Sequence, residues 1–287
     1  GVGLLMKRKE QKAAYLFLLP SLAGTAIFVL IPFADVIRRS FLKAVGNTFV
    51  GFENYREVLM NQAFREAVLH TVKFLAVCLP LLLLFSFGTA LMLCRLPAAK
   101  AFFQTLFLLP MAVPVASLVV FWKLIFHGNG LLNEVLQLFE LEGKEWMSTD
   151  AAFLILVFSY IWKNLGYDIV LWIAALSGVG EEQYEAAKVS GAGSWECFCY
   201  ITLPQMKAGM VMIGVLSFVN AFRVFREAYL IAGDYPHEST YMLQHLFNNW
   251  FTKLDIQKMS AGAVMMAAAV SVLLCLLERW NERQDAV

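Results

Sequence analysis

Six long runs of apolar residues, separated by polar segments, dominate the chain. An α-helix needs about 20 consecutive apolar residues to cross the hydrocarbon core of a bilayer, which is about 30 Å thick. The pattern therefore predicts an all-α polytopic membrane protein with six transmembrane helices. The expected spans cover residues 13–33, 71–94, 101–126, 151–176, 208–232 and 261–277.

Three prolines fall inside these spans: Pro80, Pro110 and Pro114. Neighbouring helices can satisfy the carbonyl groups that a proline leaves without a partner in a membrane helix. We therefore expect kinks at these positions and not breaks.

A shorter pattern appears in the segment 34–70 between the first two spans. Phe52, Tyr55, Val58 and Leu59 recur at helical spacing, with charged residues between them. This spacing predicts an amphipathic helix that lies against the outer ends of the spans. The other two outer segments, 127–150 and 233–260, are expected to be loops.

The composition agrees with a membrane protein. Apolar residues make up 60% of the chain and charged residues only 16%, with a mean hydropathy of +0.64, whereas soluble domains carry about 25% charged residues. A net charge of +1 without a basic tract gives no sign of nucleic-acid binding. The five scattered cysteines are interpreted as small buried hydrophobic residues, and no metal site is expected.

The distribution of basic residues sets the expected orientation. Lys7, Arg8, Lys9 and Lys12 precede the first span, which places the N-terminus in the cytoplasm. The alternative, a cleaved signal peptide, is disfavoured by the length of the apolar run and by the absence of a small-residue cleavage site after it. The predicted organisation is a cytoplasmic tail at 1–12, a transmembrane domain at 13–278 with a cytoplasmic loop at 178–207, and a cytoplasmic tail at 279–287.

That cytoplasmic loop has the most informative sequence. Residues 181–189 favour a helix with acidic residues in its first turn, where the helix dipole stabilises them. Gly191 and Gly193 then predict a stop and a sharp turn, and Pro204 can open the segment that leads into the fifth span. We expect a short surface helix whose small alanines allow another protein to approach closely. An ordinary interfacial helix-turn is the alternative.

The spacing in this loop resembles the EAA motif of ABC importer permeases, E-A-A-x3-G-x9-I-x-L-P. Glu185 begins the match, Gly191 follows at the required distance, and Ile201, Leu203 and Pro204 complete it. The family commonly has an acid before the glycine, where this chain has Ser190. The resemblance implies a type I ABC importer permease fold in which the loop contacts the ATPase through Glu185, Ala186, Ala187, Ser190, Gly191, Ala192, Leu203 and Pro204.

Further segments resemble the maltose-type branch of these permeases, which import carbohydrates. Leu18-Leu19-Pro20 resembles the first helix of that branch, and residues 49–55 resemble its outer-loop pattern F-x-G-x-x-N-Y. Residues 233–240 depart from the G-G-P that often follows the fifth span. The resemblance implies a multi-pass protein of the bacterial inner membrane, and the departure leaves the outer gate and the choice of sugar open.

Polar residues inside spans four and five are candidates for contact with a substrate, because polar groups in lipid usually face a cavity or each other. An aromatic ring beside neutral hydrogen-bonding groups suits a sugar, and the resemblance places the substrate on these two helices. The alternative is that these groups neutralise each other or bind a partner permease. The candidate lining residues are Trp162, Asn164, Gly166, Tyr167, Asp168, Ser217, Asn220 and Arg223.

The sequence lacks the phosphate-binding motif G-x-x-x-x-G-K-[ST], so this chain is expected to bind no cofactor and to have no catalytic residues. The resemblance implies that partner ATPases bind ATP and Mg²⁺. The other expected partners are a second related permease, an external solute-binding protein and membrane lipid. Two rivals stay open: an importer of this class for glycerol phosphate, an osmolyte or an amino acid, and an ion-coupled secondary transporter.

Overall fold

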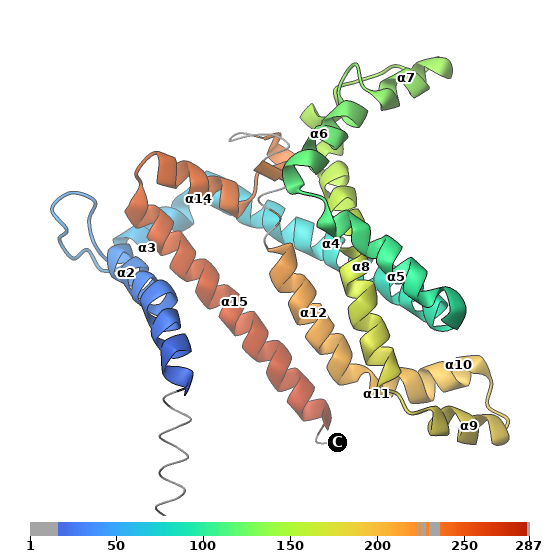
Figure 1. The fold of residues 1–287 in the computed structure, drawn as a ribbon. Coiled ribbons are helices and arrows are strands. Elements are labelled where there is room, and N and C mark those ends of the chain that lie inside the picture. Colours follow the sequence, from blue (N-terminus) through green and yellow to red (C-terminus); the bar gives the residue numbers. More distant parts are fainter. Residues whose placement is uncertain (1–16, 223, 225–227, 230–235, 286–287) are drawn as a thin grey trace, which may run out of the picture. The chain divides into compact units, whose positions relative to one another are not determined.

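The computed structural model describes residues 17–222, 224, 228–229 and 236–285 (Figure 1). The chain divides into two compact units. One comprises Gly1–Gln62 with Asn249–Val270, and the other comprises Ala63–Asn248 with Ser271–Val287. Over the described ranges the regular structure is helical, apart from an isolated antiparallel bridge between Leu42 and Phe49.

Within these ranges, five helical segments are long and apolar enough to cross a membrane, and a sixth is added if a bent pair counts as one span. The bent pair joins Ser194–Gln205 to Lys207–Ala221 at an angle of 66°. This confirms the predicted all-α polytopic fold. The five segments are Phe17–Ser40, Gln62–Cys94, Val115–Leu138, Ala151–Ser177 and Ile256–Arg279.

The first unit contains the end of the first span and the predicted amphipathic helix. The span runs through a π-helical stretch at Ala26–Leu30 into α2 (Ile31–Ser40), and α3 (Glu53–Met60) follows. The helix is where the pattern predicts it, but its buried residues are Asn54 and Val58, while Phe52 and Leu59 are exposed. The Asn54 amide donates hydrogen bonds of 2.9 Å to two carbonyl groups at the end of α2 and just beyond it. A buried polar side chain therefore fixes this helix.

The C-terminal part of the chain adds two further helices. α14 (Leu243–Thr252) lies in a segment predicted as a loop, and α15 (Ile256–Asp285) extends beyond both ends of the expected sixth span. Within the first unit, Lys258 of α15 forms an ion pair of 3.4 Å with Glu57 of α3. The N-terminal basic residues lie outside the described residues.

The second unit is arranged around α8 (Ala151–Ser177). Figure 1 shows this helix in the midst of α4, α5 (Pro97–Ala112) and α12 (Lys207–Ala221). The hydrogen bonds that join α8 to other helices include three between buried side chains. The Trp172 indole donates to Ser86 of α4 (Gln62–Cys94) at 2.9 Å, and the Trp122 indole of α6 donates to Ser159 at 2.7 Å. The third, from Ser217 of α12 to Asp168, is described below. Such bonds satisfy polar groups that lipid cannot.

The third expected span is divided. α5 (Pro97–Ala112) ends before an extended residue, Val113, and α6 (Val115–Phe126) begins after Pro114. The helices continue through Pro80 and Pro110, as expected, whereas the helix breaks at Pro114, where only a kink was expected. Proline disfavours the helical conformation at the residue before it, and Val113 adopts the extended backbone instead.

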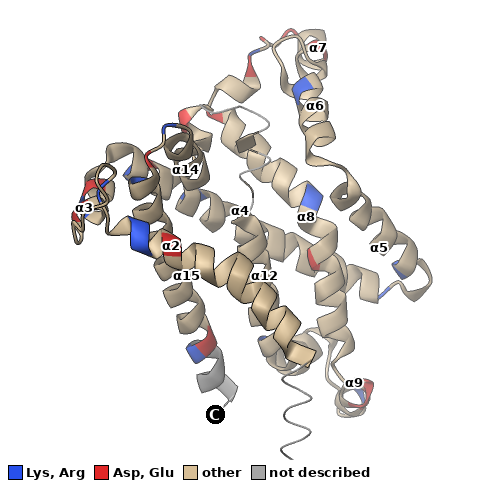
Figure 2. Ribbon diagram, turned by 60° about the vertical axis from the view of Figure 1, so that its left-hand side comes forward, with Lys and Arg blue, Asp and Glu red and all other residues tan. Residues whose placement is uncertain are grey.

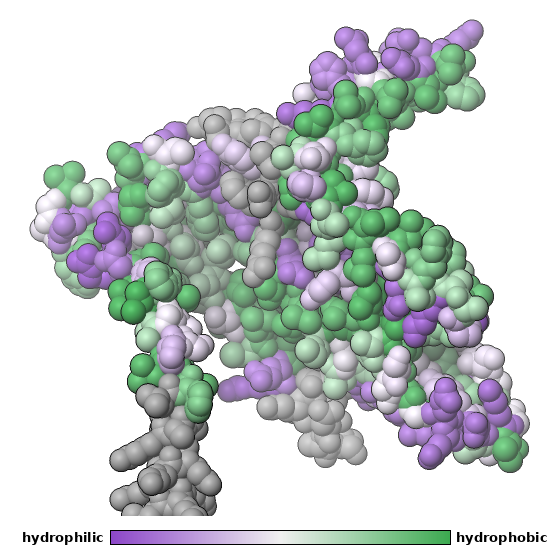
Figure 3. Space-filling view, in the orientation of Figure 1, coloured by the Kyte–Doolittle hydropathy of each residue, from purple (hydrophilic) through white to green (hydrophobic). Residues whose placement is uncertain are grey.

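The segment predicted as the second outer loop contains α7 (Leu131–Leu138) and a 3₁₀ turn at Trp146–Ser148. Its organising residue is Asn133, which is buried. The Asn133 amide donates to the carbonyl groups of Gly128 and Lys144, and its oxygen accepts a bond of 2.7 Å from the Trp146 indole. Figure 3 shows hydrophilic residues on one side of α7 and hydrophobic residues on the other.

Charged residues gather away from the middle of most helices. Figure 2 shows Lys, Arg, Asp and Glu at α3, at α7 and at α9 (Glu181–Val189), whereas the central parts of the long helices are largely uncharged. In Figure 3 the surface over α5 is hydrophobic and the surface over α9 and α10 (Ser194–Cys197) is hydrophilic. This alternation fits helices that cross lipid with polar segments at their ends.

Candidate functional site

The loop between α8 and α12 (Lys207–Ala221) begins with the predicted surface helix, α9. Its bounds are those expected from the sequence, with Glu181 and Glu182 in the first turn and Lys188 in the last. These charges oppose the helix dipole at both ends and so stabilise the helix.

The predicted turn follows this helix directly. Gly191 has a φ of +86°, a left-handed conformation that favours glycine. The N–H of Gly191 donates to Lys188 and that of Ala192 to Ala187, both at 3.0 Å, which closes the helix. Gly193 then caps α10 by donating its N–H to the Glu196 carboxylate at 2.7 Å. The motif therefore places a short helix before a tight reversal of the chain.

The outward surface of α9 is available to another protein. None of its nine residues is buried; Glu185 and Ala186 are exposed, and Val189 is 90% exposed. Ala187 and Ala192 are half-buried, while Ser190, whose hydroxyl donates to the Ala186 carbonyl at 3.1 Å, is exposed. An exposed acid beside small side chains is what the sequence predicts for a docking surface.

Two side-chain contacts tie α9 to the segment that precedes α12. The Tyr184 and Thr202 hydroxyl groups are 2.7 Å apart, and Gln205 donates to Gln183. The sequence pattern did not point to Tyr184 or Thr202, because a tyrosine and a threonine 18 residues apart have no characteristic spacing.

The rest of the motif lies at the base of α12. Leu203 is half-buried and Pro204 is exposed; both belong to α11 (Leu203–Gln205), which continues the π-helical stretch Phe198–Thr202. The proline therefore lies within a helical segment, and the chain bends by 66° after that segment, before α12 begins. Through these contacts, a movement of α9 would act on the segment Ser194–Gln205, which leads directly into the membrane helix α12.

The substrate-lining candidates do not form one cluster. Successive residues of an α-helix are about 100° apart, so Trp162 and Gly166 share one face of α8, while Asn164, Tyr167 and Asp168 lie roughly opposite. Trp162 meets Trp122 of α6 edge to face, with ring centroids 5.8 Å apart. At Gly166 an added Cβ would lie 2.0 Å from the Phe107 carbonyl oxygen of α5. This face packs against α5 and α6.

The opposite face of α8 is directed at α12. The Ser217 hydroxyl donates a hydrogen bond of 2.8 Å to the Asp168 carboxylate, and both residues are buried. Asn220 follows Ser217 by three residues, which puts it on the same side of α12. Asn164 and Tyr167 are half-buried beside Asp168 on α8, and the Asn164 amide donates to the Tyr160 carbonyl at 2.9 Å. Arg223 lies outside the described residues.

Two features together indicate the class of protein. The polar contact between Asp168 of α8 and Ser217 of α12, and the exposed helix α9 to which another protein can bind, are typical of a transport subunit. The model of the family described as binding-protein-dependent transport system inner membrane component matches residues 83–286, and the chain belongs to this family. It is therefore a permease subunit of an ABC importer, in which ATP hydrolysis belongs to a separate subunit.

Named relatives cover almost the whole chain. The trehalose/maltose permease MalF of Thermococcus litoralis is 28% identical, over 95% of this chain and 92% of its own. The sulfoquinovosyl glycerol permease SmoG of Agrobacterium fabrum is 31% identical, over 90% and 87%. The sn-glycerol-3-phosphate permease UgpA of Salmonella typhimurium is 29% identical, over 93% of each.

Solved structures support the fold. A bacterial ABC transporter involved in the import of the acidic polysaccharide alginate matches with a TM-score of 0.86 and 19% identity, over 98% of both chains. The alginate transporter in complex with an alginate pentasaccharide-bound periplasmic protein matches with a TM-score of 0.85 and 19% identity, over 98% of this chain and 97% of the other.

Proposed function

We propose that this permease carries a carbohydrate or a carbohydrate-like polyol across the inner membrane, with its termini and the loop at 178–207 in the cytoplasm. Its partners are a second, related permease, two ATPase subunits that bind ATP and Mg²⁺, and an external solute-binding protein. The observation that carries this proposal is the exposed helix α9, tied by Tyr184 to the segment that leads into α12.

The contacts suggest a route for coupling. Closure of the ATPase pair on ATP binding moves α9, and the Tyr184–Thr202 contact passes that movement to the base of α12. α12 in turn meets α8 through Ser217 and Asp168. The loaded binding protein must favour the outward-facing state, since a ligand shifts a conformational equilibrium only by its differential affinity for the two states.

The proposed cargo rests on the side chains of α8 and α12 and on the similarity of the chain to its named relatives. α8 and α12 carry an amide, two hydroxyl groups and a carboxylate in Asn220, Tyr167, Ser217 and Asp168, of which Ser217 and Asp168 are buried and bonded to each other. Such groups can exchange hydrogen bonds with sugar hydroxyls. Two of the named relatives carry sugars or a sugar glycoside. Glycerol phosphate is the second candidate, favoured by the relative UgpA.

Docking of the ATPase is tested by Glu185→Lys in the complete importer. We expect the charge reversal to release the ATPase subunits during purification or to abolish transport, because it places a cation on the surface that meets them. Glu134→Lys, an exposed charge reversal on α7, is the control and is expected to leave assembly intact. Normal transport by the Glu185→Lys importer would contradict the docking role.

The pathway is tested by Asn220→Ala. Loss of the half-buried amide on α12 should lower uptake of the cargo while the complex still assembles. Trp162→Ala serves as the comparison, since Trp162 lies on the other face of α8 and packs against Trp122. Uptake that is normal in Asn220→Ala and lowered in Trp162→Ala would assign the pathway to that other face.

A further inference from the structure

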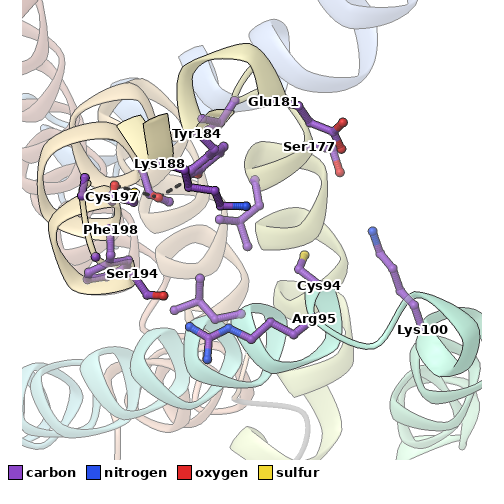
Figure 4. Close-up of a pocket in the computed structure, with 16 residues that line it drawn as sticks. Cys94, Arg95, Lys100, Ser177, Glu181, Tyr184, Lys188, Ser194, Cys197 and Phe198 are labelled. Carbon is purple, nitrogen blue, oxygen red and sulfur yellow. Dashed lines mark hydrogen bonds between the residues drawn. The ribbon is translucent and has the colours of Figure 1, made fainter. Parts of the chain in front are cut away.

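A cavity of about 780 Å³ lies behind α9, the proposed coupling helix, in the second unit (Figure 4). Its walls come from segments far apart in the sequence: the end of α4, the beginning of α5, the end of α8, and the loop from α9 through the π-helical stretch. These segments all lie at one end of the helices that are expected to span the membrane. Of the residues expected to contact the ATPase, Ala192 lines the cavity, whereas Glu185 and Ala186 do not.

The charge of the cavity is mainly positive. Figure 4 shows Arg95, Lys100 and Lys188 around one space, from α4–α5, α5 and α9 respectively. Glu181 is the single acid among the residues that line it. None of the three cations makes an ion pair with any residue that the structure describes, and the ion pairs that exist lie elsewhere. Three cations and one acid leave an electrostatic excess that favours an anion.

The remaining walls are apolar. Leu91, Leu176, Val179 and Phe198 line the same cavity. Met92 in the last turn of α4 and Leu96 just after this helix are exposed apolar residues that lie close in sequence to the lining residues Leu91 and Arg95. A free inorganic anion gains nothing from such walls, whereas a phosphate group that carries acyl chains satisfies both the cations and the apolar side chains.

We propose that this cavity binds the phosphate group of an anionic phospholipid of the cytoplasmic leaflet, held by Arg95, Lys100 and Lys188. This proposal depends on the proposed function in one respect, which is that the proposed function places this loop on the cytoplasmic side of the membrane. Because Tyr184, Lys188 and Thr202 also line the cavity, an occupied cavity braces the inner side of α9 against α4 and α8. Phospholipid composition would thereby affect how well ATP hydrolysis is coupled to transport.

The test uses the complete importer in nanodiscs of phosphatidylcholine with phosphatidylglycerol. Native mass spectrometry measures the phosphatidylglycerol retained on the complex after extraction into detergent. We expect Arg95→Gln combined with Lys100→Gln to weaken retention about 25-fold, from about fivefold for each cation removed near an anionic lipid. Lys188 is left unchanged because it belongs to the coupling helix.

Lys207→Gln is the matched control, because Lys207 is an exposed cation at the start of α12 that does not line the cavity. Retention should be unchanged in this variant. Equal retention by the double variant and the wild type would overturn the proposal, as would displacement of the phosphatidylglycerol by millimolar inorganic phosphate.

A third outcome would also contradict the proposal that the cavity binds a phospholipid. If the double variant loses its ATPase subunits in nanodiscs of phosphatidylcholine alone, the cations bind the ATPase. Failure of the proposed function has a different result, since Glu185→Lys would then transport normally whatever phospholipid is retained.

Discussion

At the scale of single residues, Gly166 lies where the backbone of α5 packs directly against α8. A Cβ at this position would meet the Phe107 carbonyl oxygen at 2.0 Å and the carbonyl carbon at 2.4 Å. Both atoms belong to the backbone, so they cannot move aside as the end of a flexible side chain could. The absence of a side chain is therefore required for packing between these two helices.

We expect Gly166→Ala to lower the stability of the importer by about 1–3 kcal/mol, the usual effect of excess volume in a packed interior. A lower midpoint of thermal unfolding in detergent, with less complex recovered, would show it. Gly214→Ala on α12 is the control, because nothing lies within 4 Å of a Cβ there. Equal stability of the two variants would contradict a packing role for Gly166.

The residues around Gly166 also show what a sequence can and cannot predict about the site. Polar and small residues in spans four and five predicted a substrate pathway along α8 and α12, and the structure brings two of these residues, Asp168 and Ser217, into contact. Which neighbouring helix each face contacts depends on how the helices pack, and that information is spread over Phe107, Trp122 and Ser217. Spacing along one helix cannot supply it.

At the scale of elements, α9 was predictable to the residue. Acids at its start, a lysine at its end and a glycine in the left-handed conformation after it are all local features. α7 and α14 were not predicted from the sequence. α7 depends on the buried Asn133 and its bonds to distant carbonyl groups, which no local pattern records.

The contact between α9 and the base of α12 gives a prediction at this scale. Tyr184→Phe removes the hydroxyl that meets Thr202, a hydrogen bond with a net contribution of about 1 kcal/mol. We expect basal ATP hydrolysis to persist, while its stimulation by the loaded binding protein falls about fivefold, the factor that corresponds to this free energy. An ATPase assay with reconstituted importer measures both rates.

Tyr200→Phe provides the comparison for this experiment. Tyr200 lies in the adjoining π-helical stretch, and its side chain is 80% exposed. The same hydroxyl is removed there without loss of a contact to α9, so stimulation should stay at the wild-type level. If both variants behave alike, the Tyr184–Thr202 contact does not transmit the movement of α9.

At the scale of the whole molecule, the expected orientation can be tested on two helices of the second unit. Figure 1 shows α7 and α9 at opposite ends of α8. If α8 spans the membrane, the two helices lie on opposite sides of it. Val189→Cys on α9 and Leu138→Cys on α7 both provide strongly exposed positions, at 90% and 82%.

We expect a membrane-impermeant thiol reagent to label Leu138→Cys in intact cells, and Val189→Cys only after the membrane is made permeable. The parent chain, with its five native cysteines, gives the background to be subtracted. Labelling of Val189→Cys in intact cells would place the coupling helix outside and would reject the orientation.

The division between α5 and α6 has a consequence for the assembled importer. At Val113 and Pro114 the chain leaves the helical conformation near the middle of an apolar stretch, where amide and carbonyl groups lose their partners along the helix. Acyl chains can offer such groups no hydrogen bonds. This stretch must consequently be shielded from lipid in the working complex, by another protein chain or by water. The part of the surface that carries Val113 and Pro114 is therefore not in contact with the hydrocarbon of the bilayer.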